Sequence, residues 1–353
     1  MSDSPIRDVY QEMAEFMSLF GPSGSLSLGP ELFRWKVHEN PSGTGRLFLE
    51  RHNDKVVGST SLTPKSLLLS GQATLGAEIG DTYTHSDFRR QGIFGRGVHT
   101  CTEFGLSQGV ELIYGTPNEN SLPGYEDKLD YLRCPKAKVV RLYKALSFRV
   151  IGELISQKVG STCIGKLLAP LYTTWESYTS TRVPGSSSQH VAVESLTRFP
   201  DGVDGAWGDR ANFAFFTRRD STYLNWRFVQ NPHSYLLFGA WCDGRLAGYM
   251  AARIYQRKLH RVAVLADFAV EGDRSDIFVP LLITVEEHMK AAGIDQLELW
   301  ASESSPYYPV FLGRKYRPAG SVNVIVYTQT VAASELLTSN KPWHFTIADS
   351  DNV

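Results

Sequence analysis

An internal repeat constrains the fold of this chain more than any other feature of its sequence. Residues 34–60, RWKVHENPSGTGRLFLERHNDKVVGST, align with residues 225–250, NWRFVQNPHSYLLFGAWCDGRLAGYM. Both copies carry a tryptophan, a basic residue and an Asn-Pro pair, and both continue into two strands around a tight turn, at Asn53-Asp54 and Asp243-Gly244. A chain that repeats one unit in this way is expected to fold as two similar units.

The repeat continues downstream and sets the expected domains. FGLSQGVELIYGTPNEN and MKAAGIDQLELWASESS each read as the end of a helix, a glycine stop, a short buried strand and a polar break. A length of 353 residues also favours two domains. We therefore predict an α+β protein of two tandem domains, each a mixed, mostly antiparallel sheet flanked by helices: residues 1–146, a helical linker over 147–188, and residues 189–353.

Composition excludes several classes of partner. The chain has 36 Lys and Arg residues against 37 Asp and Glu residues, so no overall charge attracts nucleic acid or an anionic membrane. No apolar run approaches the roughly 20 residues of a membrane span, and the first residues lack the apolar core of a signal peptide. We expect a cytoplasmic protein without a metal cofactor, and its oligomeric state stays open.

The segment DFRRQGIFGR lies between a predicted strand and a predicted helix. The strand, QATLGAEIGDTYTHS, alternates in polarity and places four side chains on one face: Leu75, Ala77, Ile79 and Tyr83. A helix is predicted to begin near Ile93, because apolar residues then recur at helical spacing: Phe94, Val98, Cys101 and Phe104.

This arrangement predicts an anion site. Gly92 falls at the helix N-terminus, where free N–H groups and the helix dipole favour an anion and the missing side chain allows close approach. Arg89, Arg90 and Arg96 add positive charge in the same loop. The alternative is a solvated basic turn that happens to contain glycine. No G-K-[ST] or G-x-G-x-x-G phosphate loop is present.

The segment THSDFRRQGIF resembles the acyl-CoA-binding signature of the GNAT superfamily of N-acyltransferases, R/Q-x-x-G-x-G/A. Arg89 and Gly92 match it, Phe94 replaces the usual Gly or Ala, and Gly95 follows directly. A second family element, N-x-x-A-x-x-L-Y, is matched in part by Asn118 and Tyr125. The resemblance covers roughly residues 34–146.

The resemblance implies an acyl-CoA site. In the family, two neighbouring parallel strands separate and admit the pantetheine arm; here these would be Thr74–His85 and Val110–Thr116. A backbone N–H near Tyr83 would meet the thioester carbonyl. The residues expected around acyl-CoA are Thr82, Tyr83, Thr84, Arg89, Arg90, Gln91, Gly92, Ile93, Phe94, Gly95, Arg96 and Asn118.

Tyr125 has the family position of the general acid that protonates the leaving thiolate, and core packing is the alternative role. For Asn118 the alternative is helix capping. The family uses no fixed residue as the base that takes a proton from the amine. We rank Asp81 first, Glu78 second and His85 third.

In the second copy, two acids replace the loop arginines and the glycine at the helix start is missing, so we expect it to be catalytically silent and to line an acceptor pocket. Glu303 and Val310 fall opposite Asn118 and Tyr125, with Tyr307 close by. Tandem units with the T-H-x-x-[FY]-R-R-x-G-I-F and P-N-E-N-S segments resemble N-acyltransferases of nucleotide-linked (dTDP or UDP) amino sugars for surface polysaccharides. The alternatives are a tandem acyltransferase for another small amine and a non-catalytic acyl-CoA-binding or scaffold protein.

Overall fold

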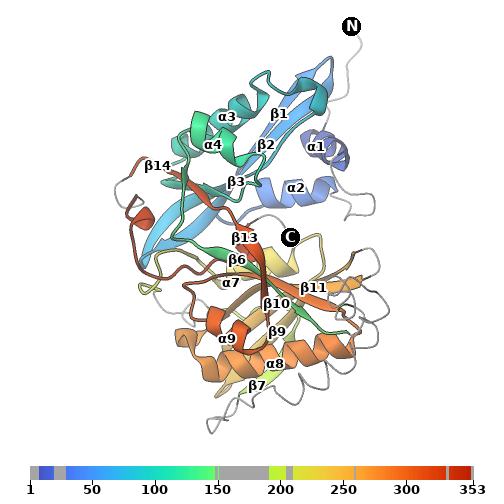
Figure 1. Cartoon of the computed structure of the whole chain (residues 1–353), viewed down its shortest axis with the longest axis vertical. Helices are drawn as coiled ribbons and strands as arrows, with labels where there is room; N and C mark the ends of the chain where they lie inside the picture. Colours follow the sequence, from blue (N-terminus) through green and yellow to red (C-terminus); the bar gives the residue numbers. More distant parts are fainter. Residues whose placement is uncertain are drawn as a thin grey trace, which may run out of the picture.

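The computed structural model describes residues 8–19, 29–147, 150, 191–203, 210–257, 260–330 and 334–350. Within these residues the chain forms two seven-stranded sheets, each with its own helices, which lie one above the other in Figure 1. The predicted α+β class with two tandem mixed sheets is confirmed. The predicted helical linker falls almost entirely outside the described residues. No helix in the described part is long and apolar enough to cross a membrane.

The first sheet has the order β1-β2-β3-β4-β14-β5, with β8 paired to β2. Its strands are β1 (Arg46–His52), β2 (Lys55–Leu69), β3 (Gln72–Thr84), β4 (Leu112–Gly115), β5 (Leu132–Arg133), β8 (Phe216–Thr217) and β14 (Ile325–Thr328). Only β3 and β4 pair in parallel among the described strands of this sheet.

Helices cover both faces of the first sheet. Phe48 packs with the core under α3 (Ile93–Ser107) and α4 (Leu122–Lys128), whereas Leu47 and Leu49 pack on the opposite face with the core of α1 (Val9–Ser18) and α2 (Pro30–Val37). This alternation is what a strand buried on both faces requires. Helix α2 lies on the side that faces the second unit (Figure 1).

The second sheet has the order β13-β6-β12-β11-β10-β9-β7. Its strands are β6 (Val139–Ala145), β7 (Ala192–Leu196), β9 (Leu236–Cys242), β10 (Arg245–Arg257), β11 (His260–Val270), β12 (Gln296–Ser302) and β13 (Arg317–Val322). One face packs with α8 (Ser275–Ala291) and α9 (Tyr308–Gly313). The other face packs with α7 (Ser221–Leu224), the π-helical turn η3 (Asn225–Val229) and α2 of the first unit. Four short 3-10 turns complete the described elements: η1 (Ser86–Phe88), η4 (Glu271–Asp273), η5 (Glu335–Leu337) and η6 (Ile347–Asp349).

The two sheets exchange strands. β6 follows the first unit in the chain but pairs with β12 and β13 of the second sheet. β14 follows the second unit but pairs with β4 and β5 of the first sheet. In Figure 1 the green β6 accordingly lies in the lower unit and the red β14 in the upper one. Each of these strands belongs to one half of the sequence and to the sheet of the other half. The division of the sequence into domains at residues 146 and 188 therefore stays a prediction.

Equivalent residues of the sequence repeat meet at the seam between the units. The rings of Trp35 and Trp226 stack with centroids 4.4 Å apart, and Trp35 Nε1 donates to the Trp226 carbonyl at 3.1 Å. Asn40 and Asn231 make matching bonds: each donates to the carbonyl four residues earlier, at 3.3 and 3.1 Å, and accepts an N–H from two residues later. The sequence repeat is thus a repeat of local structure.

The segment 343–350 ties the two sheets together and is buried throughout. The alternation of Trp343, Phe345 and Ile347 in the sequence predicts a short docked strand here, whereas the structure has one parallel β-bridge followed by η6. Within this segment, Asp349 accepts from the fully buried guanidinium of Arg219, which also binds Asp267 of the second sheet, both at 2.9 Å. The Asp349 carbonyl accepts the hydroxyl of Tyr114 on β4 at 2.5 Å.

Candidate active site

Strands β3 and β4 separate where the sequence places the acyl-CoA slot. Their parallel ladder ends with Glu78 opposite Tyr114. β3 then continues from Ile79 to Thr84, whereas β4 ends at Gly115. The outer edge of β3 has no β4 partner over this stretch, so its backbone can pair with an extended ligand.

A backbone donor faces this slot. His85 donates its N–H to the Val57 carbonyl of β2 at 2.9 Å. Because backbone groups alternate sides along a strand, the N–H of Thr84 points away from β2 and toward the slot. The Thr84 hydroxyl is also buried, without a hydrogen-bond partner among the described residues. The sequence predicts that a backbone N–H near Tyr83 meets the thioester carbonyl. Thr84, the next residue, is the one whose N–H faces the slot.

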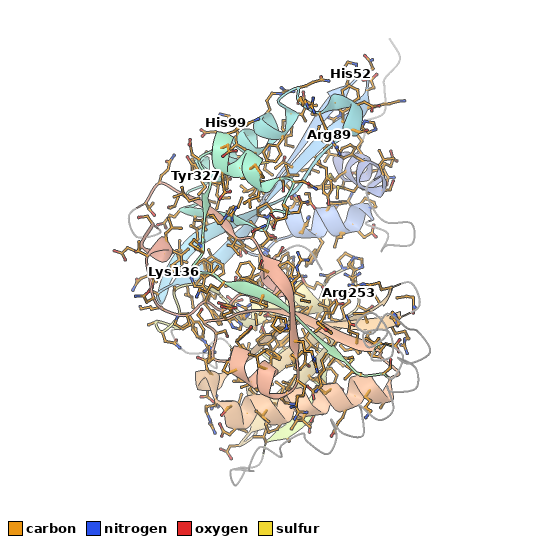
Figure 2. All side chains as sticks on the ribbon, in the orientation of Figure 1. His52, Arg89, His99, Lys136, Arg253 and Tyr327 are labelled. Carbon is orange, nitrogen blue, oxygen red and sulfur yellow. The ribbon has the colours of Figure 1, made fainter. Side chains whose placement is uncertain are left out.

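The N-terminus of α3 is open to an anion. α3 begins at Ile93, as predicted, and Gly92 is its N-cap with φ 75°, a conformation that favours glycine. No side chain caps the first N–H groups of this helix. Arg89 and Arg90 are exposed, and within the described part of the chain neither forms an ion pair; Figure 2 shows Arg89 at the outer end of the first unit.

Arg96 does not share this freedom. Its guanidinium donates to the Gln91 carbonyl at 2.9 Å and pairs with Glu50 at 2.7 Å. Arg96 therefore braces the loop, and the charge available to a ligand comes mainly from the other two arginines. Gly95 leaves open space, since no atom lies within 4 Å of the position a Cβ would take.

Phe94 replaces the small residue of the family signature, but its ring packs toward α4. The ring meets Tyr125 edge-on with centroids 5.0 Å apart, and it lies against the position that a Cβ on Gly124 would occupy. Glycine at 124 makes room for this ring. Phe94 thus fills the space between α3 and α4.

Tyr125 on α4 reaches β3 at the slot. Its hydroxyl lies 2.9 Å from the Thr82 hydroxyl, and its side chain is buried. Burial raises the pKa of Tyr125 above its ordinary value, and the Thr82 hydrogen bond lowers that pKa by less. The phenol therefore keeps its proton at neutral pH and can donate it to a leaving group.

Two of the three candidate bases lie beside the slot. Asp81 forms an ion pair with Lys36 of α2 and accepts the Ser61 hydroxyl at 2.7 Å, with 16% of its side chain exposed. Glu78 is almost fully buried, 3.4 Å from the ammonium of Lys65. Asp81 is thus the more accessible of the two carboxylates.

The third candidate, His85, lies at the end of β3. Its Nδ1 accepts the Asp87 N–H at 3.4 Å and caps η1. In addition to burial, Asp81 and Glu78 both raise the pKa of Tyr125 electrostatically. The role of His85 as a base stays a prediction.

A β-bulge in β3 changes which side chains face α4. The pairing with β2 shifts between Gly80 and Tyr83, and Asp81 takes a positive φ of 47° in this bulge. The prediction that Tyr83 shares the buried face of Ile79 is therefore wrong. Tyr83 is 38% exposed, and Thr82 takes the position against α4.

Asn118 caps the turn that opens α4. Its Oδ1 accepts the N–H groups of Asn120 and Ser121 at 3.0 and 3.1 Å. These are the capping contacts that the sequence offered as the alternative to a cofactor role. Its side-chain oxygen is engaged in the protein's own turn.

The second unit repeats the slot but fills it with its own side chains. The β11–β12 ladder ends at Leu265, and β11 continues to Val270. Tyr307 accepts the Val270 N–H at 3.1 Å and donates to Asp273 at 2.8 Å, while Arg210 donates to the Val270 carbonyl and to Asp273. The backbone edge that a pantetheine would use is therefore occupied. Tyr307, the N-cap of α9, is the side chain that occupies this edge.

The start of α8 also differs from that of α3. Its N-cap is Arg274, whose guanidinium pairs with Asp276 in the first turn at 2.6 Å. An anion at this helix start would be repelled by that carboxylate. The N-cap is also not a glycine, so a side chain limits the approach of the anion to the backbone. Both differences disfavour acyl-CoA binding in the second copy, and its catalytic silence stays a prediction.

A cavity of about 290 Å³ lies at the seam between the two copies. Its walls include Glu39 and Pro41 after α2, and Asp201, Asn225 and Gln230 of the second copy. The seam therefore has polar space, near the lower end of the size range of ligand pockets. No group of three or more His, Cys, Asp or Glu side chains in the described residues could hold a metal ion.

Residues 6–131 match the profile of the Acetyltransferase (GNAT) family. The N-terminal part of this chain is thus similar to a GNAT acetyltransferase domain, and the match covers less than half of the chain. The matched segment contains β3, the arginine loop, α3 and Tyr125. This segment is therefore similar to the acyl-CoA-dependent N-acyltransferases. No curated protein sequence matches the chain significantly.

Solved structures share the fold of the whole chain. A GCN5-related N-acetyltransferase from Anabaena variabilis ATCC 29413 is similar over 94% of this chain and 72% of its own, with TM-score 0.57 and 11% identity. A probable N-acyltransferase of unknown function from Enterococcus faecalis V583 is similar over the same shares, with TM-score 0.60 and 10% identity. A tandem GNAT protein from the clavulanic acid biosynthesis pathway is similar over 91% and 94%, with TM-score 0.55 and 14% identity. At these identities the similarity establishes the fold, and the tandem arrangement with it.

Proposed function

We propose that this protein transfers an acyl group from acyl-CoA to the primary amine of a nucleotide-linked (dTDP or UDP) amino sugar, and that residues 1–146 carry the catalysis. The observation that carries acyl transfer is the meeting of three features at one end of β3. These are the widening between β3 and β4, the uncapped start of α3, and the protonated phenol of Tyr125 beside Thr82.

The described residues fit acyl-CoA. Arg89, Arg90 and the first N–H groups of α3 would hold its pyrophosphate, while the free edge of β3 up to Thr84 would pair with its pantetheine. The co-substrate supplies an acyl carbon activated as a thioester, with a thiolate as leaving group. The matching edge of the second unit is taken by Tyr307 and Arg210, which supports a single donor site.

The residues beside the slot account for the protons. The amine attacks the acyl carbon, a C–N bond forms and the C–S bond breaks. Asp81 takes the proton from the amine nitrogen, directly or through water, and Tyr125 gives a proton to the sulfur. The Thr84 N–H stabilises the negative charge that grows on the carbonyl oxygen, a contribution of about 3 kcal/mol for a well-placed donor.

The amino-sugar acceptor is supported by the sequence segments around the arginine loop and Asn118, and by polar space at the seam on the α2 side. An acyl group that reaches the slot from the α3 side meets an acceptor from the α2 side, where Asp81 and the exposed ring of Tyr83 lie.

The test is thiol release from acetyl-CoA with a panel of dTDP- and UDP-linked amino sugars and, for comparison, simple primary amines. Release that depends on an amino-sugar nucleotide supports the proposal. Release with only simple amines would replace the acceptor class, and binding of acyl-CoA without release under any condition would favour a non-catalytic binding protein.

The donor site has its own test. Calorimetry should show that Arg89→Ala weakens coenzyme A binding about tenfold, which corresponds to 1.4 kcal/mol. Arg274→Ala is the matched control, because Arg274 begins the equivalent helix of the second unit. Equal affinity of wild type and Arg89→Ala would remove the loop from the proposal.

A further inference from the structure

Arg253 is a buried cation without a counter-ion among the described residues. It lies on β10, is 4% exposed and forms no ion pair in the described part of the chain. Its Nη2 is buried and has no hydrogen-bond partner there. Burial of an unpaired guanidinium is costly, so a buried cation of this kind points to an anionic ligand.

Two other buried arginines of this chain are neutralised by carboxylates. Arg219, fully buried on the same side of the second sheet, lies between the carboxylates of Asp267 and Asp349. Arg210 pairs with Asp273. Arg253 has no such carboxylate partner among the described residues. Burial lowers the pKa of its guanidinium, Tyr235 raises that pKa, and the positive charge of Arg227 lowers it again.

Arg227 adds a second positive charge at the same place. It is fully buried in η3, with its guanidinium 5.6 Å from the centre of the Trp35 ring and its Nη1 3.4 Å from the Tyr235 hydroxyl. His233 reports the combined field. Burial, Arg253 and Arg227 together lower the pKa of His233 to about 4, against an opposing effect of Glu31 on α2.

This cluster lies at the seam, next to the helix that reaches the slot. Figure 2 shows Arg253 just below α2, on the second unit's side. Trp35, against which Arg227 packs, is followed in α2 by Lys36, the partner of Asp81. His233 and Tyr235 are half-buried and form the outer side of the cluster.

We propose that Arg253 and Arg227 form an anion subsite that binds a phosphate group of the acceptor while its amine lies at Asp81. The inference rests on the proposed function for the identity of the ligand, but the anion site itself rests on the buried arginines. The second copy then supplies the acceptor's anchor, although its own donor slot is filled. The subsite selects phosphate-bearing amines over neutral amines of the same size.

Inorganic phosphate is the first probe, followed through the ring signals of His233 by NMR and assigned with His233→Gln. A bound anion offsets the two guanidiniums, so the pKa of His233 should rise by about one unit or more. Arg253→Met should abolish this response. Arg245→Met is the matched control, because Arg245 begins the same strand but is exposed and paired with Glu271. An unchanged His233 titration, or equal responses of wild type and Arg253→Met, would overturn the subsite.

The second arm uses turnover with the best amino-sugar nucleotide from the panel. Arg253→Met should raise the KM for the acceptor about tenfold or more, the range of a lost charge-assisted contact, and leave the KM for acyl-CoA unchanged. A rise in the KM for acyl-CoA instead would assign the subsite to the donor and overturn the inference. If no amine is acylated, the proposed function fails while the phosphate arm still decides whether the subsite exists.

Discussion

Replacement of Tyr125 by phenylalanine separates a catalytic role of this phenol from a structural one. The change removes one hydroxyl, which lies 2.9 Å from the Thr82 hydroxyl. Thr82 keeps its hydrogen bond to the Gly80 carbonyl at 3.2 Å, so no buried group loses its last partner. The stability cost should therefore be about 1 kcal/mol, the net value of one hydrogen bond.

The effect on turnover should be much larger. A general acid contributes about 10²- to 10⁴-fold, which is about 3–5 kcal/mol in the activation free energy. Turnover is measured as thiol release at saturating acyl-CoA and acceptor, and stability by urea denaturation. Because burial raises the pKa of Tyr125 and the acid form is the active one, the rate that depends on it should be lost only as pH rises past the ordinary value of 10.0.

Tyr131→Phe is the matched control. Tyr131 is buried, its ring centroid lies 5.2 Å from that of Tyr125, and its hydroxyl bonds Thr102 at 2.7 Å, away from the slot. It should lose similar stability and keep its turnover. The assignment of Tyr125 as the acid is refuted if the turnover of Tyr125→Phe stays within about threefold of wild type, which is less than about 1 kcal/mol in activation free energy. It is also refuted if both variants lose turnover alike.

Three further sets of substitutions test the fold. Gly92→Ala should destabilise the protein by about 1 kcal/mol because Gly92 has a positive φ. Gly95→Ala lies in open space within the helix and should stabilise the protein by a similar amount. Both changes are measured by urea denaturation, and equal shifts of the two variants would contradict the backbone argument. Lys36→Met should cost about 3 kcal/mol by leaving Asp81 without its cation, and adding Asp81→Asn should restore part of the loss; a purely additive double variant would exclude the coupling. Burial lowers the pKa of His344 well below its ordinary value, so only the unfolded chain takes up its proton as pH falls below about 6.5, and the unfolding free energy should decrease there; His344→Phe should flatten this pH dependence, and an unchanged slope would refute it.

Local features of the fold could be predicted from the sequence because their causes are local. The turn at Asn53 and Asp54 takes positive φ angles of 48° and 62°, as a tight hairpin requires, and α3 starts directly after Gly92. The α+β class and its repetition followed from the alignment of the two copies.

The rest depended on contacts that the sequence does not encode locally. The bulge at Asp81 reversed the face of Tyr83, since one extra residue shifts every later side chain to the other side. The pairing of Asp81 with Lys36 joins residues 45 positions apart. Arg253 gave no signal in the sequence, because only the packing of α2 against the second sheet shows that the residue is buried without a carboxylate.

The exchange of β6 and β14 makes the two halves of the chain dependent on each other. A fragment that ends before β14 lacks a strand between β4 and β5, and a fragment that starts after β6 lacks the strand between β12 and β13. Neither fragment contains all the strands of its sheet. A chain cut between residues 147 and 191 should instead stay together as one particle with both sheets complete. Because each sheet contains a strand from the other half of the chain, the second copy must be retained for the first copy to fold, even if the second copy has lost its own activity.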